Sequence, residues 1–380
     1  MASNIGNVLT LQIFGQSHSA GIGCTLDGLP AGIPVDMERL QAFMARRAPG
    51  ARDTSTPRKE ADELEVLGGI VDGHTCGAPF AAVIRNTNTR SRDYSELRVH
   101  PRPGHADYPA WVKYGNMHDV AGGGHFSGRL TAPLCAAGGI ALQALEQHGV
   151  TVAAHILELG ATAQESRAID VSYDELAQRE EPYAITPPVR EIAVTGENFA
   201  RCGMPMIDAR QADLARSLIL DAADDLDSIG GVIECGVWGL HAGVGDPMFD
   251  GMENRIARMA FGIPAVKGVE FGAGFGAANL LGSENNDPYT YDDAGRVRVV
   301  TNNAGGILGG ISTGAPIIWR AAVKPTPSIG MRQHTVDLDT GKDAPLTVRG
   351  RHDPCIVPRA VPVVEAACAL AVLDALLQDS

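Results

Sequence analysis

The chain has 380 residues and a formal net charge of −14, from 31 Lys and Arg against 45 Asp and Glu. This length allows one large or two medium domains with a sizeable buried core. The negative charge disfavours nucleic acid or an anionic membrane as a partner. The longest apolar run is interrupted by Glu365 and Asp374, so no membrane-spanning helix is expected.

Two features predict a cytoplasmic protein. The N-terminal sequence MASNIGNVLT lacks the basic start and apolar stretch of a secretory signal. The seven cysteines are odd in number, widely scattered and without a C-x-x-C pair, which is typical of reduced thiols rather than a disulfide framework.

The N-terminal part of the chain predicts two strands and a helix. Residues 7–14, NVLTLQIF, alternate apolar with polar side chains, and a second short strand is predicted at 22–28. A helix is predicted over 36–47, with Asp36 as its N-cap and arginines in its last turn. The polar loop 48–63 follows, and its basic side chains make it a candidate lid over an anionic ligand.

The remaining chain mixes helices with glycine clusters and carries a candidate internal repeat. A helix is predicted over 131–149, whereas the acidic stretch 160–215 gives no clear pattern. The segment from Gly239, GLHAGVGDPMFDGMENRIARMAFGIPA, resembles GLPAGIPVDMERLQAFMARRAPG from Gly28. We therefore expect a single α+β domain over 1–380, with two structural repeats at about 1–190 and 191–380 as its candidate division.

The histidine-rich stretch RPGHADYPAWVKYGNMHDVAGGGHFSGR, residues 102–129, is compatible with a metal site, with a loop that has no catalytic role, or with acid–base catalysis beside a bound phosphate. The spacing of its histidines lacks the i, i+4 pair or nearby cysteines of zinc sites, so no metal site is expected. GQSHS approaches the G-x-S-x-G motif of serine hydrolases, but Ser19 replaces the last glycine and a strand follows. GAGFGA at 272–277 resembles a dinucleotide fingerprint but lacks its helix.

Three loops favour the capture of a phosphate or another anion. In Gly122–Gly124 the backbone N–H groups can converge on an oxyanion, ahead of a helix N-terminus. KPTPSIG, from Lys324, is a rigid cationic loop, and GRHDPC, from Gly350, sets a cation, an imidazole and a carboxylate side by side.

These residues resemble the chorismate synthase family along nearly the whole chain. The matching motifs include FGQSH, LDGLPAGIP, RRAPG, NTNTRSRDY, RPGHADY, GGGHFSGR, AVKGVEFGAGF, NNAGGILGGIS, KPTPSI and GRHDPCIVPRAVPVVEA. The resemblance implies a phosphate lyase that converts 5-enolpyruvylshikimate 3-phosphate to chorismate, the last step of the shikimate pathway, with reduced FMN that is not net consumed. It also implies a β-α-β sandwich with internal duplication, a homotetramer, and NADPH as a candidate reductant.

The resemblance also assigns residues. His18, His105 and Asp353 correspond to the catalytic groups: His18 as proton donor to the leaving phosphate, His105 beside the reduced flavin, and Asp353 as acceptor of a flavin proton. Arg47 corresponds to an arginine linked to NADPH or the substrate entrance. The implied FMN contacts are Ser127, Gly309, Lys324, Pro325, Thr326, Pro327, Ser328 and Arg351.

Several positions depart from the family pattern and indicate a divergent subgroup. They are Gln16 and Ser19 in GQSHS, Asp53 in the candidate lid, and Ala121, His125 and Phe126 in the glycine loop. His125 either compensates as a hydrogen-bond donor or is a structural loop residue, and His118 is expected to be structural. A flavin-binding regulator and a serine hydrolase labelled at Ser17 are the alternative functions.

Overall fold

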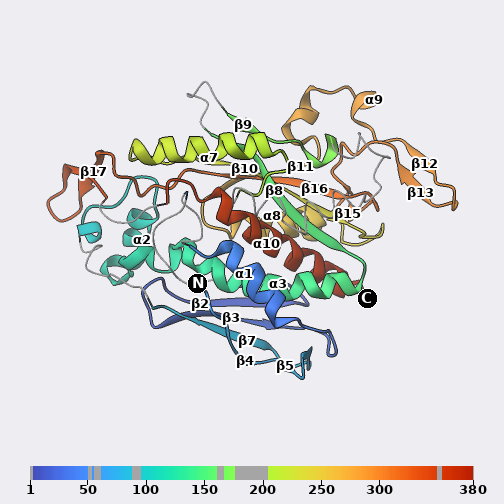
Figure 1. Cartoon of the computed structure of the whole chain (residues 1–380), viewed down its shortest axis with the longest axis horizontal. Coiled ribbons are helices and arrows are strands. Elements are labelled where there is room, and N and C mark those ends of the chain that lie inside the picture. The colour runs from blue at the N-terminus through green and yellow to red at the C-terminus, as the bar shows by residue number, and fades with distance from the viewer. Residues whose placement is uncertain are drawn as a thin grey trace.

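The computed structural model describes residues 3–49, 54, 61–87, 96–160, 167–175, 204–348 and 353–379. Two antiparallel five-stranded sheets enclose a layer of helices (Figure 1). The first sheet has the order β1 (Asn4–Ile5), β2 (Thr10–Gly15), β3 (Gly21–Asp27), β7 (Phe80–Arg85), β4 (Glu65–Gly68). The second has the order β11 (Val266–Phe271), β16 (Ile317–Val323), β10 (Gly231–Trp238), β8 (Thr151–Leu159), β9 (Ala168–Ile169).

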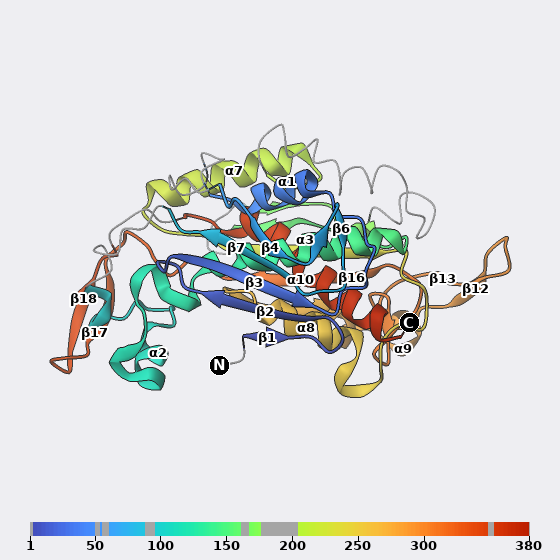
Figure 2. The same ribbon diagram turned by 90° about the horizontal axis from the view of Figure 1, so that it is seen from below.

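The helices between the sheets come from both halves of the chain. Seen from below, β2, β3 and β7 lie in front of this layer (Figure 2). The layer contains α1 (Met37–Arg47), α3 (Thr131–Gln147), α8 (Met252–Phe261) and α10 (Val357–Gln378). Outside it lie α2 (Asp107–Tyr114), α7 (Ala209–Asp224), which packs beside β9, and α9 (Gly282–Asn285).

Short hairpins complete the structure. Those of β12–β13 and β17–β18 project at opposite ends of the molecule (Figure 1). The four pairs are β5 (Ile70–Val71) with β6 (His74–Thr75), β12 (Tyr289–Tyr291) with β13 (Val297–Val299), β14 (Ile307–Leu308) with β15 (Ile311–Ser312), and β17 (Gln333–Asp337) with β18 (Lys342–Leu346).

The predicted α+β sandwich is confirmed, and its element order occurs twice. In the first series β2 and β3 precede α1, and β4 and β7 precede α3; in the second β8 and β10 precede α8, and β11 and β16 precede α10. The neighbours within each sheet correspond as well, β2-β3-β7-β4 against β8-β10-β16-β11. The division near residue 190 stays a prediction, and the second series begins with β8 at Thr151.

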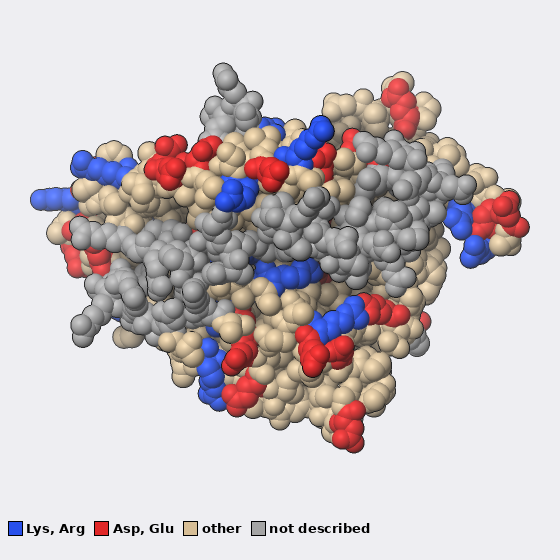
Figure 3. Space-filling view, in the orientation of Figure 1, with Lys and Arg blue, Asp and Glu red and all other residues tan. Residues whose placement is uncertain are grey.

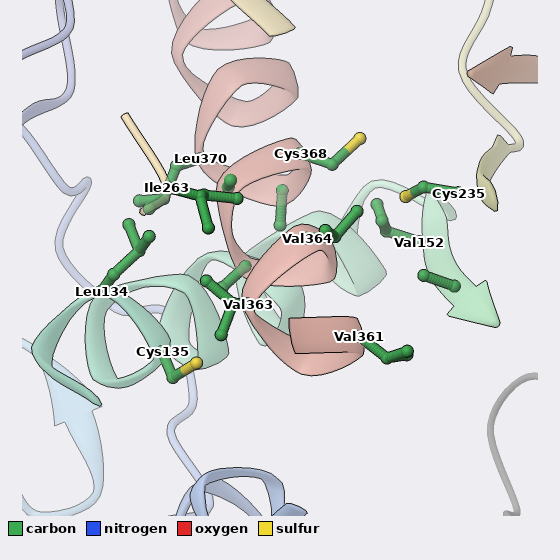
Figure 4. Close-up of a cluster of buried hydrophobic side chains, with 14 of the residues drawn as sticks. Leu134, Cys135, Val152, Cys235, Ile263, Val361, Val363, Val364, Cys368 and Leu370 are labelled. Atoms are coloured by element: carbon green, nitrogen blue, oxygen red, sulfur yellow. The ribbon is translucent and has the colours of Figure 1, made fainter. Parts of the chain in front are cut away.

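Helix α10 is the centre of the core. Val363 lies beside Leu134 and Cys135 of α3, while Cys368 and Val364 point toward Val152 of β8 and Cys235 of β10 (Figure 4). Its length and composition would suit a membrane span, but 94% of its most apolar window is buried inside the protein. Apolar side chains all around a helix are expected where every face is covered by protein.

The local sequence explains several boundaries. The Asp36 side chain accepts a hydrogen bond from the backbone N–H of Arg39 at 3.0 Å, so α1 begins where the N-cap signal predicts. GQSHS connects β2 to the antiparallel β3 and leads into no helix, so the serine hydrolase alternative is not supported. Residues 274–279 form only a short 3-10 helix, as expected for an incomplete dinucleotide fingerprint.

Candidate functional site

A pocket of about 640 Å³ opens where the ends of several elements converge. The last residue of α1, the starts of α3 and α10 and the end of α8 all contribute to its wall. The remaining wall comes from residues 102–106, the glycine loop and residues 324–328. Because α3 and α10 present their N-terminal ends here, their dipoles favour an anionic ligand.

Most of the predicted site residues lie at this pocket. Its lining includes Arg47, His105, Ser127, Lys324, Thr326, Pro327, Ser328 and Asp353. His18 and Pro325 do not line the pocket. Arg351 lies outside the described residues, as do Arg52, Asp53 and most of the candidate lid.

The structure does not bring Gly309 to this pocket. The adjacent Gly310 packs against Asp246 and Gly251 at the N-terminal end of α8. The pocket instead includes Phe261 and the residues that follow the C-terminal end of the same ten-residue helix. A helix of this length spans about 15 Å. The β14–β15 turn that contains Gly309 is therefore separated from the pocket by the length of α8.

The triple glycine makes room for both predicted catalytic histidines. Gly122, Gly123 and Gly124 have φ values of 61°, 84° and 53°, which side chains disfavour. A Cβ atom at Gly122 would lie 2.7 Å from Nε2 of His18, and one at Gly123 would lie 3.3 Å from Nε2 of His105. The two imidazoles therefore approach successive residues of one loop.

His105 belongs to a buried charged cluster that the sequence reasoning missed. Its Nδ1 lies 2.5 Å from Oδ1 of Asp107, and Arg102 donates from Nε to Oδ2 of the same carboxylate at 2.7 Å. Burial lowers the pKa of His105, and the nearby charges of Arg102 and Lys324 lower it further against the opposing effect of Asp107. The imidazole is thus mostly neutral at neutral pH.

Lys324 and Ser328 connect the second predicted loop to this cluster. Lys324 donates from Nζ to the carbonyl of Gly104 at 3.0 Å, and Arg102 donates from Nη1 to Oγ of Ser328 at 3.0 Å. Burial and the charge of Lys267 lower the pKa of Lys324. The two loops therefore form one wall of the pocket.

A second cluster lies behind the glycine loop. Asp62 accepts from Nη2 of Arg47 at 2.7 Å and also bonds to Arg129. Although burial alone would raise the pKa of Asp62, the two guanidinium groups hold it below its usual range. Arg47 also donates to Oγ1 of Thr131 at 3.1 Å, so this predicted contact residue is itself firmly held and only 2% exposed.

Asp353 is paired with an arginine that the sequence analysis did not single out. Arg359 donates from Nη1 to Oδ2 of Asp353 at 2.5 Å and from Nε to the carbonyl of Arg47 at 2.9 Å. Burial lowers the pKa of Arg359. Arg359 lies six residues after Asp353, in the first turn of α10, and this short spacing could have indicated the pair.

Charge and shape together define what the pocket can hold. Its lining contains five Arg and Lys side chains but one carboxylate, which favours an anion despite the acidic chain. On the face seen in Figure 3, by contrast, acidic and basic groups are interspersed. The lining also contains apolar residues that suit a flat aromatic ring, namely Phe261, Ile263, Pro264, Ala265, Val266 and Ile356.

The other two histidines of the stretch differ from His105. His125 lines the pocket, packs against the ring of Phe126 with centroids 4.1 Å apart, and has no hydrogen-bond partner for Nε2 within the described residues. His118 is buried outside the lining, with Nδ1 3.0 Å from the carbonyl of Gly115.

Sequence comparisons relate the chain to one family. A family profile described as chorismate synthase matches residues 9–377. A chorismate synthase of Lancefieldella parvula is 47% identical, covering 99% of this chain and 96% of the relative. One of Korarchaeum cryptofilum is 42% identical, covering 98% and 97%. A crystal structure of chorismate synthase has a TM-score of 0.73 at 26% identity, covering 99% of this chain and 93% of that chain.

Proposed function

The chain belongs to the chorismate synthase family, and we propose that the pocket described above is its active site. The protein is accordingly a carbon–oxygen lyase acting on a phosphate, which forms chorismate from 5-enolpyruvylshikimate 3-phosphate. One observation carries the assignment of the site: His105 and Asp353 line a cationic pocket, and His18 approaches the same glycine loop as His105 without itself lining the pocket. A flavin-binding regulator would not require such an arrangement of acid and base groups.

The residues present fit reduced FMN. The apolar lining residues after α8 suit the flat ring system, while Lys324, Ser328 and Ser127 offer donors to the polar parts. When bound, reduced FMN supplies an electron or hydrogen that it recovers within each cycle, since loss of phosphate and a proton is not a net oxidation. NADPH is the candidate reductant, with Arg47 as its predicted contact.

The chain's own groups manage the protons and the charge. His18 donates a proton to the departing phosphate, which leaves beside the arginines and the N-terminal end of α3. Asp353, whose Oδ2 accepts a hydrogen bond from Arg359, is the group that we assign to accept a proton.

We further propose that the protein is a homotetramer and that it is located in the cytoplasm. Large exposed apolar side chains support a homotetramer, among them Phe249, Phe275, Leu281, Tyr289 and Tyr291. The six cysteines among the described residues are free thiols, which supports the cytoplasm.

Binding of FMN tests the proposed site directly. Replacing Lys324 with alanine removes a charge-assisted donor, so the Kd for FMN should rise about tenfold or more. Lys342, an exposed lysine on β18, provides the matched control, and Lys342→Ala should leave the Kd unchanged. Fluorescence titration of FMN measures both, and equal Kd values for the two variants would contradict the site.

A further inference from the structure

The two ring nitrogens of His105 face different surroundings. Nδ1 points to Asp107, whose side chain is only 4% exposed. Nε2 points to the glycine loop, where the absence of a side chain at Gly123 leaves it open to the pocket. An ionised carboxylate can only accept hydrogen bonds, so the hydrogen on this neutral imidazole resides on Nδ1.

Arg102 holds the carboxylate rather than the imidazole. Its backbone N–H, Nε and Nη2 donate to Asp107 at 3.0, 2.7 and 2.9 Å. Its Nη2 also lies 3.1 and 3.3 Å from the two nitrogens of His105. An atom in the plane of the ring at similar distances from Nδ1 and Nε2 would overlap with Cε1. Nη2 of Arg102 therefore lies over the face of the imidazole ring.

We propose that Asp107 is a positioning residue for the reaction: it fixes the tautomer and orientation of His105, so that Nε2 carries protons to and from the pocket. This inference rests on the proposed active site. A carboxylate behind an imidazole supports the charged ring when the outer nitrogen is protonated. Arg102 and Lys324 oppose that charge, and Asp107 is the one carboxylate that contacts the ring within the described residues.

The first test observes the tautomer in the full-length protein without substrate. Nitrogen NMR of histidine-labelled protein should show His105 with its hydrogen on Nδ1 in the wild type. Asp107→Asn should abolish that preference or shift the pKa of His105 downward, because the amide lacks the negative charge. A wild-type His105 with its hydrogen on Nε2 would overturn the proposal, whatever reaction the pocket performs.

The second test separates an effect through His105 from one through Arg102 or the fold. Asp107→Asn should lower kcat roughly 10- to 100-fold and move the acid limb of the pH profile. In a His105→Ala background the same substitution should change kcat less than about twofold, because residues that act as a unit are not additive. An equal loss in both backgrounds would show that Asp107 does not act through His105.

A matched control comes from a second histidine–aspartate pair. His155 and Asp170 lie at 3.2 Å on the second sheet, outside the pocket lining. Asp170→Asn should affect stability but leave the kcat of the folded enzyme and its pH profile unchanged. A similar kcat loss in this variant would show that the effect at Asp107 reports only on the fold. Full activity of His105→Ala would instead contradict the proposed role of His105, while the tautomer result would stand.

Discussion

Two buried histidine–aspartate pairs in the described part of the chain differ in their charge behaviour. His155 lies between two carboxylates, with Nδ1 3.2 Å from Asp170 and Nε2 3.3 Å from Glu234, which together raise its pKa to about 9 despite complete burial. His105 has one carboxylate and two nearby cations, so burial leaves its pKa below the usual value. The first pair is charged at neutral pH, whereas the second keeps a nitrogen facing the pocket.

The difference follows from where the strands place the charges. Register sets Glu234 of β10 between His155 of β8 and Arg320 of β16, so the ionic row crosses the second sheet. Both nitrogens of His155 are used within this row. His105 lies in a loop at the end of the sandwich and faces the glycine loop. A ring nitrogen that faces the pocket therefore distinguishes His105 from His155, whose two nitrogens both contact carboxylates.

The largest expected effect is on catalysis. His105→Ala, His18→Ala and Asp353→Ala should each lower kcat by about 10²- to 10⁴-fold, because a positioned acid or base contributes that much. Thermal unfolding of His105→Ala should change little, since this side chain lines the pocket and is not part of the apolar core. Phosphate release under anaerobic conditions measures the loss, and folded variants with full activity would refute the assignment.

Glu234→Gln should lower the stability of the protein but leave its kcat nearly unchanged. Removing one carboxylate from the buried row leaves the charges of His155 and Arg320 insufficiently paired, which should cost about 3–5 kcal/mol of unfolding free energy. The kcat of the folded fraction should stay near that of the wild type. Urea unfolding together with kinetics checks both, and a stable variant with low kcat would contradict the division between the two pairs.

The pH dependence of stability should also report on His155. Because its folded pKa of about 9 exceeds the ordinary value of 6.5, its contribution is complete below about 6.5 and is lost as pH rises through about 9. The urea midpoint should therefore fall over this interval in the wild type. His155→Gln should lose stability at neutral pH and show a flatter profile; an unchanged slope would mean that another group titrates there.

The smallest effect is expected at His118. Its Nδ1 contacts the carbonyl of Gly115 and its side chain does not line the pocket. His118→Ala should therefore leave kcat within about twofold, because it removes no acid or base from the site. A loss comparable to that of His105→Ala would show that the three histidines of the stretch have been assigned wrongly.

Sequence alone predicted the features that depend on local pattern. The N-cap at Asp36 and the alternation in β2 both correspond to elements of the structure. Family motifs selected residues that the fold does bring to one pocket. The two-residue strands β1 and β9 were missed because they are too short to show a period.

Charge partners were harder to predict because they depend on contacts across the fold. Asp62 joins Arg47 and Arg129 from distant parts of the chain, and no spacing rule indicates such a contact. Asp107 lies only two residues from His105 and could have been noticed. Its orientation, however, is fixed by Arg102 and by the start of α2, which only the structure shows.

The most direct test of the proposed active site counts phosphate released per flavin. Enzyme-bound FMN is reduced once under anaerobic conditions, and 5-enolpyruvylshikimate 3-phosphate is then added in large excess. A pocket that uses reduced FMN without net oxidation should release many phosphates per flavin and restore the reduced spectrum. Release of one phosphate per oxidised flavin, or equal release with oxidised FMN, would contradict the mechanism.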